Sequence, residues 1–207
     1  MSRKIFGVVV ALFMCLPFQA QAQLEGEAYY NDLYCQTCHG TDGVGNVGVQ
    51  APRLAGMEPW YLKRQLENFR SGVRGMHPED FQGSEMQPMA ALLTDEGIAE
   101  VVEWVGSWSY VPTEITIDGD ATAGATLYGT CATCHGNSAE GSEAMGAPAL
   151  AGQNDWYLVT QLTNFRAGYR GAHPQDSHGS QMLAFARMLT DDKAITDIVS
   201  YINTLGR

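Results

Sequence analysis

CQTCHG (residues 35–40) and CATCHG (residues 131–136) are two copies of one motif, and they lie 96 residues apart. The same offset aligns residues 35–95 with residues 131–191 without a gap, and about half of the aligned positions are identical. APRLAG recurs as APALAG, and WYLKRQLENFRSGVRGMHPED recurs as WYLVTQLTNFRAGYRGAHPQD. A chain that repeats itself over this length is expected to fold as two homologous domains.

The boundaries of these domains follow from changes in the sequence pattern. Helical periodicity stops at residues 111–119, which contain a Pro and a Gly, so we expect one domain over 23–111 and another over 112–207. Residues 1–22 have a basic start, an apolar run of about 14 residues and a small-x-small ending at Ala22. They are expected to be a cleaved secretory signal, with an uncleaved anchor as the alternative. No later stretch is apolar enough to cross a membrane, which predicts a soluble, exported protein.

Four of the five cysteines lie in the two motifs, and the fifth, Cys15, lies in the expected signal. A redox dithiol is expected beside a βαβ pattern, which is absent here. A zinc site made from both motifs would join units separated by 92 residues. Covalent haem explains both the adjacent His and the duplication, because two thiols add to the vinyl groups of one haem. We therefore expect two haem c groups, with four thioether cysteines and two iron ligands: Cys35, Cys38, Cys131, Cys134, His39 and His135.

Each domain is predicted to be helical. Apolar residues recur at helical spacing in residues 60–70 and 156–166. Further helices are expected over 24–34 and 121–130, and after the caps Thr94 and Thr190. The segments between them are rich in Gly and are expected to be loops, and no strand-like alternation appears. The predicted fold class is therefore all-α.

A haem iron that only carries electrons needs a second axial ligand. The candidates are Met57, Met76, Met86, Met89, His77, Met145, Met182, Met188, His173 and His178. Only the pairs Met86/Met182 and His77/His173 recur at the offset of 96, and we interpret the His pair as surface residues in a polar loop. Met86 and Met182 are the predicted ligands, on the loop that enters the last helix. Methionine ligation raises the potential relative to a second His, which suits a carrier fed by a quinol-oxidising complex.

Other repeated residues are candidates for supporting the cofactor. Pro52 and Pro148 follow the motif His by 13 residues, and a carbonyl there is either a hydrogen-bond acceptor that orients the His or part of an ordinary loop. Repeated arginines either pair with haem propionates or end solvated helices; they are Arg70, Arg166, Arg74 and Arg170. The repeated Trp-Tyr pairs at 60–61 and 156–157 are interpreted as packing residues rather than electron relays.

The net charge of the chain limits the class of macromolecule that it is expected to bind. The chain has 23 acidic and 12 basic residues, a net charge of −11 and no basic run, which excludes binding to nucleic acid by electrostatics. An apolar content of 45% excludes a disordered chain. Loss of the signal removes two basic residues, so we expect a redox partner with a basic docking surface.

With these motifs in place, the chain resembles the diheme cytochrome c4 family over nearly all of residues 24–207. The matching signs are two CxxCHG units, each followed by P-x-L-A-G, by Y-L-x-x-Q-L-x-x-F-R-x-G-x-R and by a Met before L-T-D. The resemblance implies two class I cytochrome c folds related by pseudo-twofold symmetry, with haem propionates facing across the interface. It also implies His39/Met86 and His135/Met182 as the axial pairs.

The resemblance further implies periplasmic electron transfer, often toward a haem-copper oxidase, rather than catalysis by this chain itself. The alternative is an enzyme or an enzyme subunit, such as a diheme peroxidase, a thiosulfate-oxidising cytochrome or the haem subunit of a flavocytochrome sulfide dehydrogenase. A peroxidase needs an open iron, and two matching methionines argue against one.

Overall fold

The structure is a computed structural model that describes residues 18–206, with side chains from residue 25. Most of the expected signal, residues 1–17, lies outside the described residues. The N-terminal half comprises α1 (Phe18–Asp32), α2 (Cys35–His39), η1 (Val47–Val49), α3 (Pro59–Arg70), α4 (Phe81–Ala90) and α5 (Asp95–Gly106). The C-terminal half comprises α6 (Ala121–His135), η2 (Glu143–Met145), α7 (Asp155–Ala167), α8 (Ser177–Ala186) and α9 (Asp192–Leu205). The all-α prediction is confirmed: residues 18–206 contain no strand, only two isolated bridges.

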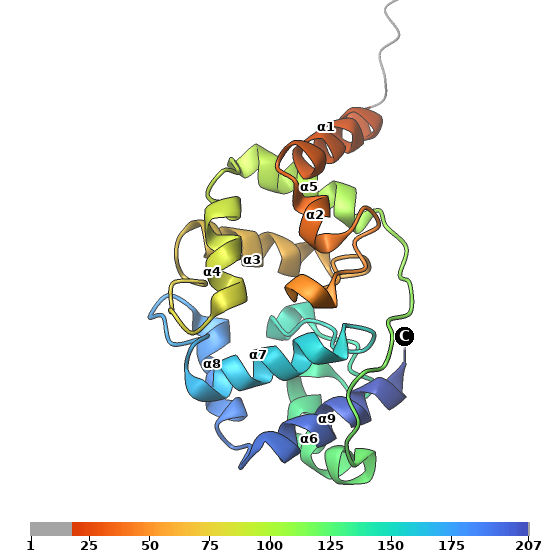
Figure 1. Cartoon of the computed structure of the whole chain (residues 1–207), viewed down its shortest axis with the longest axis vertical. Helices are drawn as coiled ribbons and strands as arrows, with labels where there is room; N and C mark the ends of the chain where they lie inside the picture. The colour runs from red at the N-terminus through yellow and green to blue at the C-terminus, as the bar shows by residue number, and fades with distance from the viewer. Residues whose placement is uncertain (1–17, 207) are drawn as a thin grey trace, which may run out of the picture.

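The two halves stack end to end, and the connection from α5 to α6 runs down one side of the molecule (Figure 1). Each half has its own apolar core. The N-terminal core contains Tyr30, Leu62, Leu93, Ile98, Val101, Val102 and Val105. The C-terminal core contains Tyr128, Ala139, Ala151, Leu158, Ile198, Val199 and Ile202. Two separate cores agree with the two repeats in the sequence.

In each half, the first and last helices cross at a glycine. A Cβ on Gly26 would lie 2.2 Å from the carbonyl oxygen of Glu100, and one on Gly124 would lie 1.9 Å from that of Asp197. Both distances are shorter than van der Waals contact, so only glycine lets α1 approach α5, and α6 approach α9, this closely. This crossing packs the helix that leads into CxxCH against the last helix of the same half.

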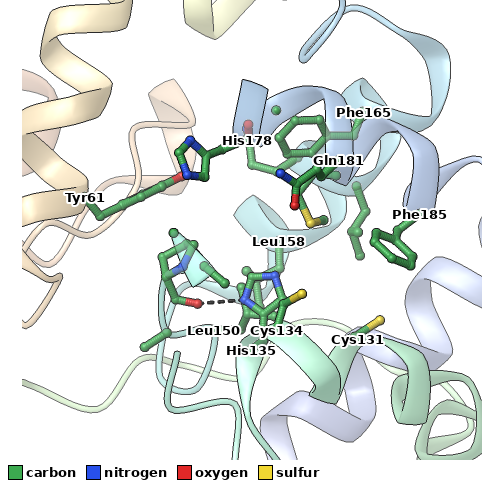
Figure 2. Close-up of a pocket in the computed structure, with 18 of the residues that line it drawn as sticks. Tyr61, Cys131, Cys134, His135, Leu150, Leu158, Phe165, His178, Gln181 and Phe185 are labelled. Carbon is green, nitrogen blue, oxygen red and sulfur yellow. Dashed lines mark hydrogen bonds between the residues drawn. The ribbon is translucent and has the colours of Figure 1, made fainter. Parts of the chain in front are cut away.

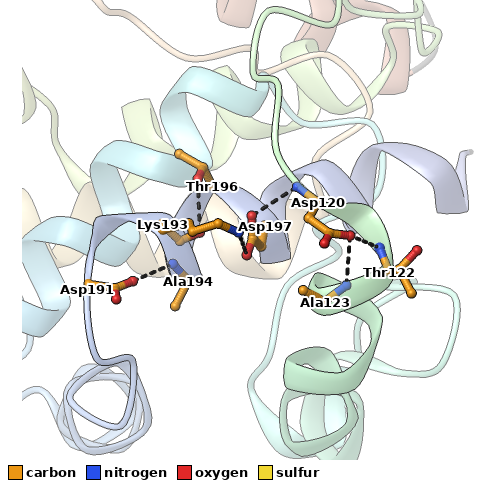
Figure 3. Close-up of polar contacts among 8 residues, drawn as sticks. All are labelled: Asp120, Thr122, Ala123, Asp191, Lys193, Ala194, Thr196 and Asp197. Atoms are coloured by element: carbon orange, nitrogen blue, oxygen red, sulfur yellow. Dashed lines mark hydrogen bonds and ion pairs between the residues drawn. The ribbon is translucent and has the colours of Figure 1, made fainter.

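Side chains reinforce this crossing in the C-terminal half (Figure 3). The Asp197 carboxylate accepts the backbone N–H of Asp120 at 2.9 Å and pairs with Lys193 Nζ at 2.6 Å. Asp120 in turn caps α6, accepting from the N–H groups of Thr122 and Ala123. The start of α6 is therefore tied directly to α9.

Three details of the predicted helices are wrong. The segments with Met86 and Met182 are the helices α4 and α8, not loops; their Gly, Ser and Pro residues have low helix propensity, but Asp80 and Asp176 cap them. The cap of α9 is Asp191 rather than Thr190. Finally, α6 continues through CATCH to His135 instead of ending near Thr130.

Between α5 and α6, residues 109–120 form no regular element. The buried Asp155 carboxylate, at the first residue of α7, accepts the backbone N–H groups of Thr116 and Ile117 at 2.6 and 2.8 Å. It also accepts the Thr116 hydroxyl at 2.7 Å.

No helix in the described part of the chain is long and apolar enough to span a bilayer.

Candidate functional site

The CxxCH units form single helical turns, which place the two cysteines and the His close together. CQTCH is the short helix α2, and CATCH is the last turn of α6. A tyrosine hydroxyl holds the end of each turn: Tyr30 donates to the carbonyl of Gly40 at 2.7 Å, and Tyr128 donates to that of Gly136 at 2.8 Å. This role is not among the predictions from sequence, although a Tyr shortly before each CxxCH is a signal for it.

Each half contains a cavity beside its CxxCH turn. The C-terminal cavity has an empty volume of about 1300 Å³, including space open to solvent, and the N-terminal one about 990 Å³. The predicted residues that line them are Cys35, His39, Pro52, Arg74 and Met86 in one half, and Cys131, Cys134, His135, Pro148, Arg170 and Met182 in the other. Cys38 is exposed and lies outside the N-terminal lining set. Each hollow is large enough for a large ligand.

The motif histidines are oriented for binding a metal. Nδ1 of His39 lies 2.8 Å from the Pro52 carbonyl oxygen, and Nδ1 of His135 lies 2.7 Å from that of Pro148 (Figure 2). With Nδ1 as the donor, Nε2 carries the free lone pair. Nε2 of His135 is buried without a hydrogen-bond partner, as expected for a nitrogen that binds a metal.

Burial favours the neutral ring that binds iron. Desolvation lowers the pKa of His39, although the hydrogen bond to Pro52 opposes this shift. Desolvation also lowers the pKa of His135, against the opposing effects of Pro148 and the Glu58 carboxylate. Both shifts favour the neutral ring, the form in which His is a metal ligand.

The structure reduces the candidates for the second axial ligand. Met86 and Met182 reach the cavities from α4 and α8. Met89 and Met57 also line the N-terminal cavity, and Met57, Met145 and His178 line the C-terminal one. His77, His173, Met76 and Met188 line neither cavity. Met86 and Met182 are the only candidate pair at equivalent positions that line the cavities.

The repeated arginines separate into two groups. Arg74 and Arg170 are buried at the junction of the halves, and each crosses it: Arg74 Nη2 donates to Gln161 at 3.0 Å, and Arg170 Nη2 donates to Gln65 at 3.0 Å. The other two arginines form ion pairs with exposed acids: Arg70 pairs with Asp95, and Arg166 pairs with Asp192. The proposal that Arg70 and Arg166 hold propionates is therefore not supported by their positions.

Arg74 and Arg170 are buried cations, and within the protein the carboxylate of Asp176 only partly offsets the charge of Arg170. Within residues 25–206 neither forms an ion pair, and Nε of each is buried without an acceptor. Nearby guanidinium groups, chiefly that of Arg170, hold the pKa of Tyr61 below its ordinary value, although burial would raise it. A buried cation without an ion pair is costly, so an anionic group of the cofactor would stabilise both arginines at this junction.

The two cavities adjoin at the junction of the halves. Five residues line both: Met57, Tyr61, Gln65, Tyr157 and Gln161. The tyrosines bind across the junction, with Tyr61 accepting from Arg170 at 3.0 Å and Tyr157 from Arg74 at 3.3 Å. They were interpreted as packing residues because nothing in one repeat shows which residues face the other.

Comparison with known proteins agrees with this geometry. Residues 23–109 and 121–206 each match the family model described as Cytochrome c. The chain is 32% identical to the thiosulfate dehydrogenase electron acceptor of Stutzerimonas stutzeri (strain A1501), over 94% of this chain and 92% of that protein. It is 30% identical to cytochrome c4 of Azotobacter vinelandii, over 95% and 98% of the two chains. The crystal structure of reduced recombinant cytochrome c4 from Pseudomonas stutzeri aligns with a TM-score of 0.66 and 27% identity, covering 87% of this chain and 96% of that one.

Proposed function

The chain belongs to the cytochrome c family, as a tandem protein of the diheme cytochrome c4 kind with two covalently bound haem c groups, and we propose that it is a periplasmic one-electron carrier. In this proposal it takes electrons from a quinol-oxidising complex or a dehydrogenase and passes them to a terminal acceptor such as a haem-copper oxidase. The observation that carries the proposal is the pair of adjoining cavities, each with a CxxCH turn and a His fixed through Nδ1.

We assign the iron ligands as His39 with Met86 and His135 with Met182. Each His is fixed by a carbonyl, and each Met lines the same cavity from a capped helix. The haem supplies a one-electron ferrous/ferric couple when bound. With a His and a Met both holding each iron, no position would remain open for a substrate, which fits electron transfer rather than catalysis.

The side chains around the cavities serve this role by fixing positions and excluding water. Cys35, Cys38, Cys131 and Cys134 are the attachment points of the two groups. We assign Arg74 and Arg170 to the propionates, since both are buried and lack an ion pair within the described chain. Because the cavities share lining residues, electrons have a short path between the two sites.

A second candidate function is the electron-accepting subunit of a periplasmic dehydrogenase, such as a flavocytochrome sulfide dehydrogenase. It is favoured by the similarity over nearly the whole chain to a protein named as a thiosulfate dehydrogenase electron acceptor. In both functions the partner is a redox protein. The acidic surface, with a net charge of −11 for the whole chain, suits a basic docking surface on that partner.

Purification of the native protein under gentle conditions tests these functions. A free carrier is expected to elute alone, with two haem additions and a start at Gln23 by mass spectrometry. Its electron-transfer rate with a basic redox partner should fall as salt rises, because salt screens the attraction. A stoichiometric flavoprotein in the preparation, with rates insensitive to salt, would establish the subunit function instead. A retained N-terminus would overturn the cleaved signal.

A further inference from the structure

One peptide group in each half lies between the motif His and the opposite half. The carbonyl of Pro52 accepts from Nδ1 of His39 at 2.8 Å, and the N–H of the same peptide, on Arg53, donates to Asn154 Oδ1 at 2.7 Å. The C=O and N–H of a trans peptide point in opposite directions. The group therefore connects the His of the N-terminal half to a side chain of the C-terminal half.

The C-terminal half contains the equivalent connection in the reverse direction. The carbonyl of Pro148 accepts from Nδ1 of His135 at 2.7 Å, and the N–H of Ala149 donates to Glu58 Oε1 at 3.1 Å. Glu58 and Asn154 occupy equivalent positions, because each is the N-cap residue of the helix that follows, α3 or α7. The pair differs in charge: the C-terminal His is connected to a carboxylate, and the N-terminal His to a neutral amide.

A glycine packs closely against each of these peptide groups. A Cβ on Gly45 would lie 2.7 Å from the nitrogen of Arg53, and one on Gly141 would lie 2.4 Å from the nitrogen of Ala149. Both glycines also have positive φ angles, of 86° and 82°. The close approach leaves each peptide little room to rotate, so its two hydrogen bonds remain aligned.

The charge at the far end of such a connection affects the His. A hydrogen bond to the N–H polarises the C=O of the same peptide and strengthens the bond that this C=O accepts. A charged acceptor makes a bond roughly twice as strong as a neutral one. A stronger acceptor at Nδ1–H makes the imidazole a better donor to iron, which stabilises the ferric state and lowers the reduction potential.

We propose that Glu58 is a positioning residue of the N-terminal half that lowers the reduction potential of the C-terminal haem, acting through the Pro148–Ala149 peptide and His135. Asn154 makes the equivalent contact toward the N-terminal haem without a charge. This inference rests on the proposed ligation of the irons by His39 and His135. It makes the potential of each haem depend on one side chain of the other half.

The test uses the holoprotein with two near-isosteric variants, Glu58→Gln and Asn154→Asp. Both keep an acceptor oxygen and therefore the contact between the halves. Glu58→Gln should raise the potential of the C-terminal haem, by up to about a tenfold change in the ferrous-to-ferric ratio, or about 59 mV for one electron. Asn154→Asp should lower the potential of the N-terminal haem. The NMR signal of the His ring Nδ1–H in the reduced protein should move for His135 in the first variant and for His39 in the second.

A matched control removes a charge near the same haem without touching the peptide. Glu140 is exposed, and its carboxylate accepts from Ser138 N at 2.8 Å, close to the same CxxCH turn. Glu140→Gln should leave the His135 Nδ1–H signal unchanged. If Glu58→Gln shifts the potential no more than Glu140→Gln, or leaves the His135 signal in place, the proposed connection is overturned. Failure of the proposed ligation by His39 and His135 is distinguishable from failure of this proposal. It would be visible in the haem spectrum of the unmutated protein, before any variant is made.

Discussion

In the N-terminal half, a break separates α1 from α2, the helix that begins at the first cysteine. In the C-terminal half, the single helix α6 continues to His135. Tyr30 and Tyr128 make the same hydrogen bond to the glycine after CxxCH. Four residues separate Tyr30 from Cys35, but only two separate Tyr128 from Cys131. The two extra residues are absorbed by a break between α1 and α2, where Tyr34 takes a left-handed φ of 58°. The tyrosine, the cysteine and the His thus keep their relative positions although the chain lengths differ.

The first residue of the equivalent helices α3 and α7 also differs between the halves. The first residue of α3 is Pro59, whereas the equivalent residue of α7 is Asp155, which binds the connecting segment. The residues assigned to the cofactor, in the CxxCH units and at the repeated Pro, Arg and Met positions, recur at the offset of 96, whereas Pro59 and Asp155 differ. The comparison indicates that the positions assigned to the cofactor are kept equivalent in the two halves, whereas the packing of the surrounding helices differs.

The methionines proposed as iron ligands provide the most severe test of the equivalence of the halves. Met86→Ala and Met182→Ala should each open one iron, remove its share of the methionine-to-iron charge-transfer band and lower that haem's potential, by about 0.1 V or more. Visible spectra and redox titration measure both effects. Met89→Leu is the control, because Met89 lines the N-terminal cavity but corresponds to Phe185. Loss of the band in Met89→Leu and its retention in Met86→Ala would reverse the assignment.

Asp155→Asn should affect stability in only one half. Burial alone would raise the pKa of Asp155, but hydrogen bonds from Thr116, Ile117 and Trp156 hold it below its ordinary value. Removing the charge should destabilise the C-terminal half by about 1–3 kcal/mol at pH 7. Because the folded pKa is depressed, this stability is present above the unfolded pKa of about 3.9 and is lost as pH falls through the folded value.

Denaturant unfolding at several pH values measures this difference. The gap between Asp155→Asn and the unmutated protein should narrow as pH falls below about 4. Asp118→Asn, at an exposed acid of the same connecting segment, should change stability little. A gap that stays constant with pH would show that the Asp155 charge is not what holds the connection.

The arginines at the junction should have similar effects in both halves. Arg74→Gln and Arg170→Gln each remove a buried cation beside the proposed propionates, which favours the ferric state. Each should lower the potential of the nearer haem by about 59 mV, a tenfold change for one electron. Arg70→Gln, at an arginine paired with Asp95, is the control. If neither potential moves in the junction variants, Arg74 and Arg170 hold the halves together without contacting the cofactor.

The smallest effect is expected on the outer face of α5. Lys193 and Asp197 of α9 form an ion pair one turn apart, whereas the equivalent residues of α5 are Glu96 and Glu100. Burial, with repulsion from Glu25 and Glu103, raises the pKa of Glu100. Glu96→Lys would replace like charges with an ion pair and should stabilise the N-terminal half by about 0.5–1 kcal/mol. Thermal unfolding of Glu96→Lys and of the neutral control Glu96→Gln separates the new attraction from the lost repulsion.

Sequence alone predicted the parts of this molecule that repeat. The fold class and the two haem groups followed from the duplicated CxxCH and its adjacent His, and both are confirmed. Sequence did not predict α4 because Gly83, Ser84 and Pro88 disfavour a helix, nor α8 because Gly179 and Ser180 do, although a cap and tertiary packing stabilise both. The Asp191 cap was missed because one extra residue shifts the alignment before α9.

Contacts between the repeats were beyond sequence analysis. Recurrence between the two repeats identified Arg74 and Arg170, but not their crossed bonds to Gln161 and Gln65. Glu58 gave no signal, because its function depends on a peptide 91 residues away. Such positions depend on how two folded bodies dock, which periodicity and spacing do not encode.

The crossed hydrogen bonds also set an order of completion during synthesis. The N–H of Arg53 bonds to a residue 101 positions later, and at about 5–20 residues per second that residue emerges roughly 5–20 seconds afterwards. The N–H of Ala149, in contrast, bonds to Glu58, which has already been made. The contact of Arg53 therefore needs a residue made later in the chain, whereas the contact of Ala149 uses a residue made earlier.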